Sequence, residues 1–325
     1  MNEIDASNLA FLGGQNVKYI CILLTNDRHT MSPAQSLRKR LLNPEIMVIP
    51  GGGSPIELRQ IEAAGFEAGY VSGYATAAAR YGEPDIGLIA YADIEDSVHA
   101  IRRVTTIPLI VDCDTGYGDV ANVVRTVRGM ELLGVAAVQL EDQAWPKRCG
   151  HMDNKIVESR EIAVRKIRAA VAARNNPDTL IVARTDARGP LGIKEALERC
   201  MLFKEAGADI LFVDGPQSLE ELEQIGRELP GPLLANMSET GLTPLRSATE
   251  LQQMGYAIAL FPSSTVRLTI KTVDDFLTDL KKTGDSRAWV DKMASLEQTN
   301  NALGLNKIRN FEQELLSKEQ SIRPL

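Results

Sequence analysis

The chain has 325 residues, of which 44% are hydrophobic and 24% are charged. Its 36 basic and 43 acidic residues give a net charge of −7, so it lacks the basic surface with which proteins neutralise a nucleic-acid backbone. Four Cys residues, none at Cys-X-X-Cys spacing, are too few for a disulfide scaffold and indicate a reducing, cytoplasmic compartment. The longest apolar run near the N-terminus, around Tyr19–Leu24, is far shorter than the roughly 20 residues that cross a bilayer, which argues against a membrane protein.

Residues 1–34 are predicted to be a polar N-terminal extension, and after them short apolar runs alternate with amphipathic stretches. The predicted strands are Ile46–Ile49, Ala68–Val71, Ile107–Val111, Val135–Leu140, Leu180–Ala183, Ile210–Val213, Leu233–Ala235 and Ile258–Phe261. The predicted helices include Pro55–Ala64, Ser97–Val104, Val120–Leu133, Ser159–Arg174, Ile193–Ala206 and Leu219–Leu229. Near-continuous apolar strands that alternate with helices are typical of a parallel sheet covered by helices. Eight such units favour an α/β fold of the (β/α)8 TIM-barrel type over residues 35–270.

Residues 271–325 are predicted to be a helical C-terminal segment without strands. Leu, Ile and Phe residues and Trp289 recur there on an amphipathic pattern. Because such a face has to be buried somewhere, the segment predicts packing between subunits and therefore an oligomer.

Polar or ionisable residues follow six of the eight predicted strands. These strand ends read Ser72-Gly73-Tyr74, Asp112-Cys113-Asp114, Glu141-Asp142-Gln143, Arg184-Thr185-Asp186, Asp214-Gly215 and Asn236-Met237-Ser238-Glu239. In a closed barrel they would all converge on the mouth at which such enzymes hold their active sites. The alternative is that polar residues only mark where a strand meets solvent, but six largely acidic cases favour a site.

Asp112, Asp114, Glu141 and Asp85 form an acidic cluster at predicted strand ends and in a loop. Carboxylates gathered in one mouth repel one another unless a cation neutralises them. Oxygen ligands with little His and no Cys pair suit Mg²⁺, or Mn²⁺, better than zinc. The alternative is a set of solvated or helix-capping carboxylates. Asp119 and Asp142 are predicted to be structural.

Cys149 lies in the segment Lys147-Arg148-Cys149-Gly150-His151, between two cations and a His. Such neighbours lower the pKa of a thiol and favour a reactive Cys. The alternative is an inert, apolar Cys, which is how we interpret Cys21, Cys113 and Cys200. Gly150 would give the segment the freedom to bend.

Two further features concern anion binding. Arg184 closes a strand and could bind a carboxylate in a bidentate manner, or could instead form a structural pair with Asp186. The turn Gly51-Gly52-Gly53-Ser54 lacks the Lys-Ser/Thr of a P-loop, so we predict a tight turn in which Ser54 caps the next helix.

Across roughly residues 35–270 the chain resembles the isocitrate lyase/phosphoenolpyruvate mutase superfamily, in the branch of 2-methylisocitrate lyase, 2,3-dimethylmalate lyase and petal death protein. The motifs that carry the resemblance are Ser72-Gly73-Tyr74, Gly82–Leu88, Asp112–Gly118, Asn122–Val127, Glu141-Asp142-Gln143, Pro146–His151, Ala183–Ala187 and Asn236. The Cys-Gly-His sequence of the loop is typical of the carbon–carbon lyases of the superfamily.

The resemblance implies a (β/α)8 barrel whose last helix swaps between subunits, usually in a homotetramer, with Mg²⁺ in the barrel mouth. It implies metal contacts from Asp112 and Asp114, with Asp85, Glu141 and Asp214 around the ion; the position of Asp214 is commonly Glu in the family. Substrate contacts are implied for Ser72, Gly73, Tyr74, Arg184, Asn236 and Glu239. Lys147, Cys149 and His151 would take part in catalysis with Arg184, from a mobile loop.

The function expected from the residues and the resemblance is cleavage of a carbon–carbon bond in a 2-hydroxy di- or tricarboxylate of the 2-alkylmalate or 2-methylisocitrate type. A 2-oxo acid such as pyruvate would leave, and Cys149 would protonate the other fragment. The nearest alternatives are hydrolysis of oxaloacetate to oxalate and acetate, or its decarboxylation. Phosphonate chemistry is less favoured because of the Cys149 loop, and a non-catalytic barrel that binds carboxylic acids is less favoured because the acidic cluster, Arg184 and Cys149 are all present.

Overall fold

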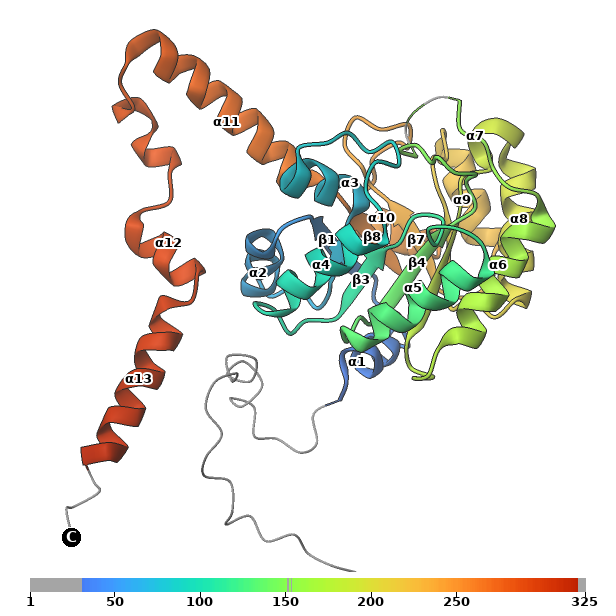
Figure 1. Cartoon of the computed structure of the whole chain (residues 1–325). Helices are drawn as coiled ribbons and strands as arrows, with labels where there is room; N and C mark the ends of the chain where they lie inside the picture. The colour runs from blue at the N-terminus through green and yellow to red at the C-terminus, as the bar shows by residue number, and fades with distance from the viewer. Residues whose placement is uncertain (1–30, 151, 153, 321–325) are drawn as a thin grey trace, which may run out of the picture. The chain divides into compact units, whose positions relative to one another are not determined.

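Eight parallel strands close into a barrel in the computed structural model, which describes residues 31–150, 152 and 154–320 (Figure 1). The strands are β1 (Met47–Gly52), β2 (Gly69–Val71), β3 (Leu109–Asp112), β4 (Ala137–Glu141), β5 (Leu180–Thr185), β6 (Ile210–Val213), β7 (Leu233–Asn236) and β8 (Ile258–Phe261). Each strand pairs with its neighbour in the sequence, and β8 closes the barrel on β1 with Met47 opposite Ile258. The predicted TIM barrel is therefore confirmed.

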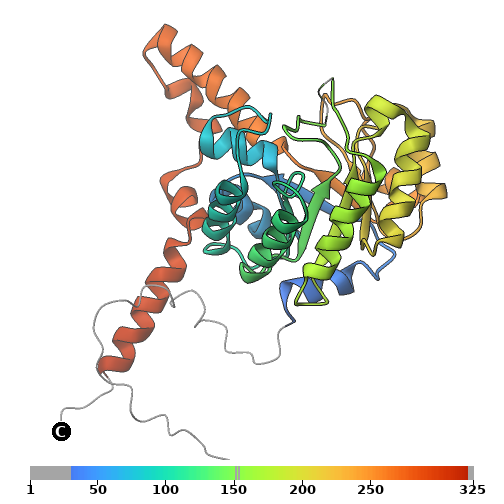
Figure 2. The ribbon, with the colours of Figure 1, turned by 45° about the vertical axis from the view of Figure 1, so that its right-hand side comes forward.

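Helices follow the strands and surround the barrel (Figures 1 and 2). They are α1 (Pro33–Arg40), α2 (Pro55–Ala63), α3 (Gly73–Thr76), α4 (Tyr91–Arg102), α5 (Val120–Leu132), α6 (Arg160–Ala173), α7 (Arg188–Leu191), α8 (Ile193–Glu205), α9 (Leu219–Glu228) and α10 (Ala248–Gln253), with a π-helical turn η1 (Ala77–Tyr81). The prediction for Ser97–Val104 was wrong at its start, because α4 begins six residues earlier. Its first turn is capped by the Asp93 carboxylate, which accepts a hydrogen bond from the Ala90 amide at 2.8 Å.

The core has two parts that follow from the alternation of strand side chains. Residues such as Ile49, Tyr70, Ile110 and Phe212 fill the inside of the barrel, where Leu37 of α1 joins them. The other strand residues pack outward against the surrounding helices in a second, larger cluster. Because the strands are covered on both faces, they are apolar along almost their whole length.

The end of β1 and the turn after it contain glycines that lie against other backbone segments. A Cβ atom at Gly51 would overlap the Pro262 backbone, and one at Gly53 would overlap the Ala75 backbone. Ser54 then occupies the N-cap position of α2, where its backbone N–H donates to the Glu57 carboxylate at 3.0 Å. Gly51 and Gly52 thus belong to β1 and not to the predicted turn, whereas Ser54 caps α2 as predicted.

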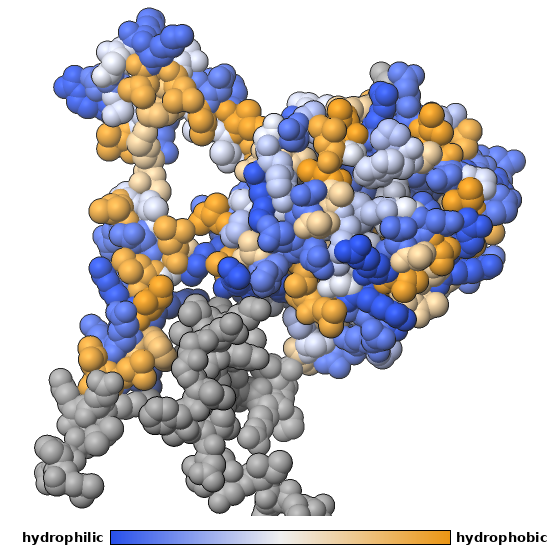
Figure 3. Space-filling model, viewed as in Figure 1, coloured by the Kyte–Doolittle hydropathy of each residue, from blue (hydrophilic) through white to orange (hydrophobic). Residues whose placement is uncertain are grey.

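The C-terminal part of the chain is helical, with α11 (Ser264–Thr283), the 3-10 helix η2 (Arg287–Lys292), α12 (Leu296–Ala302) and α13 (Leu305–Gln320). The hydroxyl of Thr265, in the first turn of α11, donates a 2.9 Å hydrogen bond to the Gly51 carbonyl of β1. Apolar side chains that are about half or more exposed recur along these helices and appear in orange in Figure 3; they include Leu268, Leu277, Val290, Leu296 and Leu303. None of the helices in the described part of the chain combines the length and the apolar content needed to cross a membrane.

Candidate active site

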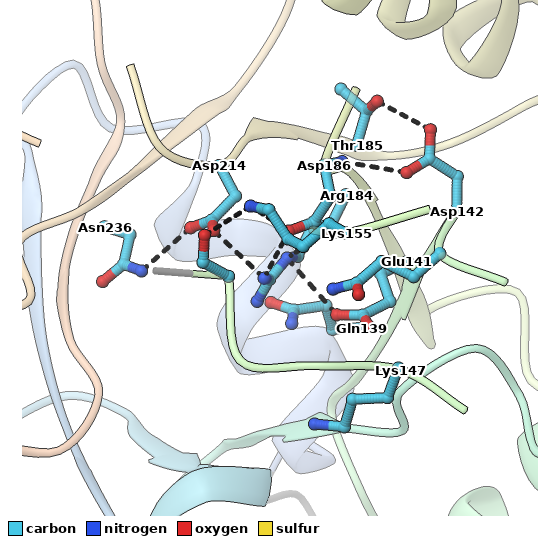
Figure 4. A network of polar contacts seen from close by, with 12 residues as sticks. Gln139, Glu141, Asp142, Lys147, Lys155, Arg184, Thr185, Asp186, Asp214 and Asn236 are labelled. Atoms are coloured by element: carbon cyan, nitrogen blue, oxygen red, sulfur yellow. Dashed lines mark hydrogen bonds and ion pairs between the residues drawn. The ribbon is translucent and has the colours of Figure 1, made fainter. Parts of the chain in front are cut away.

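A cavity of about 220 Å³ opens at the carboxyl ends of the strands. Its lining draws residues from β2 to β8 and from the loops that follow them, and Figure 4 shows the polar network on one side. The lining includes Tyr70, Ser72, Tyr74, Asp85, Asp112, Glu141, Lys147, Cys149, Arg184, Asp214, Asn236, Glu239 and Arg267. The barrel therefore brings most of the predicted site residues to one place.

Asp85, Asp112 and Asp114 meet at the β3 side of the cavity, where Lys147 lies between two of them. The Lys147 Nζ atom is 2.5 Å from Oδ1 of Asp85 and 2.7 Å from Oδ1 of Asp114. Asp112 accepts hydrogen bonds at Oδ1 from the Gln139 side chain and from the Asp114 backbone N–H, each at 3.2 Å. The cluster is buried, since Asp85, Asp112 and Asp114 are all less than 9% exposed.

The cluster has more negative charge than its lysine neutralises. Burial raises the pKa of Asp114 to about 7; the Lys147 ammonium opposes this shift and the Asp112 carboxylate adds to it. Burial also raises the pKa of Glu141 well above its ordinary value, although Arg184 opposes the change. Among the described residues, Oδ2 of Asp114 and Oε1 of Glu141 receive no hydrogen bond. Buried carboxylate oxygens without a donor fit an added hard cation such as Mg²⁺.

The carboxylates do not yet form a coordination shell in this arrangement. Within residues 31–150, 152 and 154–320, no three His, Cys, Asp or Glu side chains converge on a point that could hold a metal ion. Two of these carboxylates, those of Asp85 and Asp114, instead contact the Lys147 ammonium.

Arg184 is at the centre of a second group of charges, on the β5 and β6 side (Figure 4). Its guanidinium forms two hydrogen bonds with Asp186, at 2.9 and 3.0 Å, and a third with Oδ2 of Asp214 at 3.1 Å. Glu141 is 3.4 Å away, and the other oxygen of Asp214 accepts from the Asn236 amide at 3.0 Å. The pairing with Asp186 that the sequence offered as the alternative is therefore present, and Asp214 here contacts Arg184 and Asn236.

The residues that follow β2 form the wall of the cavity across the barrel from β6. Ser72 is the N-cap of α3, where its hydroxyl accepts a hydrogen bond from the Ala75 amide at 3.2 Å. Ser72 and Tyr74 line the cavity, whereas Gly73 lies behind them and donates its N–H to Oδ2 of Asp112 at 3.4 Å. The Gly73 amide is thus directed at a carboxylate of the protein in this arrangement.

Cys149 lies on the long loop that follows β4 and covers the cavity. Its backbone N–H donates to the Asp85 carbonyl at 3.1 Å, and its side chain is partly exposed in the lining. The neighbouring Gly150 lies against Asp214 and Arg184 so closely that a Cβ atom would overlap both. His151, predicted to act with Cys149, lies outside the described residues.

Glu239 reaches the cavity from the loop after β7. One carboxylate oxygen accepts from the Ser264 hydroxyl at 2.5 Å, and the other is 3.6 Å from the Arg267 guanidinium. Arg267 and Tyr70 also line the cavity, although sequence reasoning did not select them. Tyr70 lies two positions before Ser72. Because alternate residues of a strand point to the same face, this spacing could have placed Tyr70 inside the barrel.

Asp119 and Asp142 have the structural roles that the sequence predicted. Asp119 is an exposed N-cap residue that pairs with Arg165 at 3.3 Å. Asp142 is buried, accepts a 2.7 Å hydrogen bond from the Thr185 hydroxyl and pairs with Arg199 at 3.0 Å. Cys113 and Cys200 are also buried, as expected for inert thiols, while Cys21 falls outside the described residues.

Known proteins that are similar to this chain show its family and fold. The family model for phosphoenolpyruvate phosphomutase matches residues 37–281. The chain belongs to the phosphoenolpyruvate mutase/isocitrate lyase superfamily. It is 42% identical to 2,3-dimethylmalate lyase of Eubacterium barkeri over 87% of this chain and 98% of the relative. It is 40% identical to 2-methylisocitrate lyase of Aeropyrum pernix, over 89% and 93% of the two chains.

Solved structures of the superfamily share the fold. A 2,3-dimethylmalate lyase structure superposes with a TM-score of 0.83 at 34% identity, covering 88% of this chain and 96% of that one. Oxaloacetate acetylhydrolase in complex with 3,3-difluorooxalacetate also gives a TM-score of 0.83, at 33% identity, over 87% and 97%. Phosphonopyruvate hydrolase in complex with oxalate and Mg²⁺ gives 0.79 at 26% identity, over 88% and 100%. Close relatives of this chain are thus carbon–carbon lyases, and hydrolases occur among its structural neighbours.

Proposed function

We propose that this protein is a Mg²⁺-dependent lyase that splits the C2–C3 bond of a 2-hydroxy dicarboxylate or tricarboxylate and releases a 2-oxo acid such as pyruvate. The observation that carries the proposal is the arrangement of one cavity: an acidic cluster at β3 and β4, Arg184 next to Glu141 of that cluster, and Cys149 on the covering loop. The relatives named 2,3-dimethylmalate lyase and 2-methylisocitrate lyase support the same class of reaction.

The residues that would hold the ion are Asp112 and Asp114, with Asp85 and Glu141 next to them. Their oxygen-only donor set and their buried oxygens without hydrogen bonds suit Mg²⁺, with Mn²⁺ as the nearest substitute. When bound, the ion polarises the 2-hydroxyl group and the adjacent carboxylate of the substrate and lowers the pKa of that hydroxyl. Asp214, whose two oxygens are occupied by Arg184 and Asn236, would contribute through those side chains.

The remaining steps fall to the protein. The substrate carboxylates would be oriented by Arg184, Asn236 and the segment Ser72–Tyr74. Glu239 also lines the cavity. The hydroxyl proton would pass to a carboxylate of the cavity such as Glu141, whose pKa burial raises. The C2–C3 bond then breaks, and its electron pair stays on the departing carboxylate fragment. The Cys149 thiol donates a proton to that carbon as general acid. The loop over the cavity, which carries Lys147, keeps bulk water away from the carbanion.

A second candidate is hydrolysis of oxaloacetate to oxalate and acetate. It is favoured by the structural similarity to oxaloacetate acetylhydrolase, which equals the similarity to the lyase. Both reactions break the C2–C3 bond of a diacid. The polar residues that line the cavity therefore do not by themselves distinguish a lyase from a hydrolase.

The test is a product assay with the purified protein. Methylisocitrate, 2,3-dimethylmalate, other 2-alkylmalates and oxaloacetate are each supplied with Mg²⁺ or with EDTA, and pyruvate and oxalate are quantified. We expect pyruvate from at least one 2-alkylmalate-type acid in the presence of Mg²⁺ and none with EDTA. Oxalate from oxaloacetate without cleavage of any 2-hydroxy acid would establish the hydrolase instead, and no product from any acid would refute both.

We also propose that the C-terminal helices pack against a second copy of the chain, in an assembly such as a homotetramer. Leu268 and Leu277 on α11 are 68% and 53% exposed, and further apolar side chains follow on α12 and α13. Burial of such a face against another subunit would stabilise the assembly by about 25 cal/mol per Å² of apolar surface. Sedimentation of Leu277→Asp should give a smaller species than the wild type, whereas Leu132→Asp, at an 89% exposed position of α5, should not. A monomeric wild type would contradict the proposal.

A further inference from the structure

Lys155 is a buried cation to which the proposed reaction gives no role. Its side chain is only 3% exposed, although it lies on the loop that covers the cavity. The Nζ atom donates a hydrogen bond to the Gly150 carbonyl and another, at 3.0 Å, to Oδ1 of Asp186. Figure 4 shows Lys155 beside Arg184 and Asp186, at the end of β5. One ammonium group therefore joins the loop backbone to the strand.

Asp186 has a second cationic partner besides Lys155. The Arg184 guanidinium already gives the Asp186 carboxylate two hydrogen bonds, at 2.9 and 3.0 Å. What Lys155 adds is the contact with the Gly150 carbonyl, a hydrogen bond from a charged donor in a buried setting, which is stronger than one between neutral groups. The negative charges of Asp186 and Asp214 offset the desolvation of the ammonium.

Gly150 is held on its other side by contact with the cavity wall. A Cβ atom there would overlap the Asp214 carboxylate and the Arg184 guanidinium, so the backbone lies directly on this pair. Since Cys149 is the preceding residue, the position of the Gly150 peptide decides where the thiol is presented.

We propose that Lys155 is a positioning residue that fixes the Lys147–Gly150 segment against Arg184 and thereby sets the place of the Cys149 thiol. Lys155 acts through the Gly150 carbonyl and Asp186 and does not touch substrate. The expected fall in kcat rests on the proposed function, whereas the expected change in the exposure of the Cys149 thiol does not.

The experiment measures alkylation of Cys149 by iodoacetamide in Lys155→Met, in a Cys21→Ser background. Cys113 and Cys200 are fully buried, so Cys149 is the thiol followed, and peptide mass spectrometry identifies the alkylated site. We expect the alkylation rate of the folded variant to rise at least fivefold and kcat to fall at least tenfold. Lys194→Met is the matched control, because Lys194 on α8 has a 91% exposed side chain, and it should change neither quantity.

A folded Lys155→Met protein, with wild-type circular dichroism, whose Cys149 is alkylated within twofold of the wild-type rate would overturn the proposal, even if its activity fell. Should Lys155→Met not fold, Lys155→Gln gives the same test, since it lacks the charge and the reach to bridge Gly150 and Asp186. If the wild type cleaves none of the acids, the proposed function fails, but the alkylation rates still decide the role of Lys155.

Discussion

The Nζ atom of Lys147 lies 2.7 Å from Oδ1 of Asp114, so the loop that carries Cys149 contacts the end of β3 through a buried ion pair. The same ammonium pairs with Asp85. A single positive charge thus stands between two carboxylates that, together with Asp112, have the chemistry of a divalent cation site.

The first prediction concerns this cluster. Asp114→Asn removes a charge from the proposed Mg²⁺ site, and we expect the affinity for Mg²⁺ to fall about 100-fold, measured by isothermal titration calorimetry. Asp119→Asn is the matched control, because Asp119 has a 67% exposed side chain at the start of α5. The Mg²⁺ affinity of this variant should equal that of the wild type. Equal Mg²⁺ binding by Asp114→Asn and the wild type would remove this residue from the metal site.

The second prediction concerns the general acid. Cys149→Ser places a much weaker acid at the same position, and we expect kcat to fall about 10²–10⁴-fold, the usual contribution of general acid–base catalysis. Cys200→Ala alters a thiol that is buried on α8, so it should lower the melting temperature slightly and leave kcat unchanged. Steady-state pyruvate release measures kcat of both variants. Near wild-type cleavage by Cys149→Ser would show that another group donates the proton.

The third prediction uses the close contact of Gly150. In Gly150→Ala the added methyl group overlaps the Asp214 carboxylate and the Arg184 guanidinium, so the loop or this ion pair must shift. We expect kcat/KM to fall about 100-fold, because displacement by about 1 Å is enough for such a loss. Gly189→Ala provides the comparison: its Cβ would lie at an ordinary 3.4 Å from Cε of Lys155. Similar kinetics for the two variants would mean that the loop is not seated on this pair during turnover.

The fourth prediction is a pH dependence of stability. Burial alone would raise the pKa of Asp186, but Arg184 and Lys155 hold it well below its usual range. Such a carboxylate stabilises the fold above its unfolded pKa of about 4, and the contribution is lost as the pH falls through the lower folded pKa.

Asp186→Asn removes this contribution and leaves buried cations with one partner fewer. We therefore expect the free energy of unfolding at pH 7 to fall by about 3–5 kcal/mol and to change less between pH 7 and pH 3 than in the wild type. Urea denaturation at pH 7, 5 and 3 tests this. Asp96→Asn, at an exposed position of α4, should follow the wild-type curve. Parallel curves for Asp186→Asn and the wild type would refute the assignment.

The sequence predicted the barrel because its strands are buried on both faces and so appear as apolar runs. Each of the eight runs overlaps a strand, and β5 extends beyond its run to Thr185 because polar residues continue the strand into the mouth. The start of α4 was missed because a residue inside the helix, Asp93, supplies its cap.

The contacts within the site could not be predicted in the same way. Lys147 and Asp85 are 62 positions apart, and their ion pair depends on how the loop after β4 folds over the mouth. Strand ends indicated which residues meet, but the choice of Asp186 and Asp214 as partners of Arg184 depends on side-chain geometry that spacing does not encode.

The closure of the barrel between β8 and β1 has a consequence for biosynthesis. Every carboxylate of the acidic cluster lies between Asp85 and Glu141, yet the ring that brings β1 to β4 into their places is completed only when Ile258–Phe261 pairs with Met47–Pro50. A nascent polypeptide on the ribosome therefore carries all of these acidic groups before the segment that closes the barrel has been synthesised.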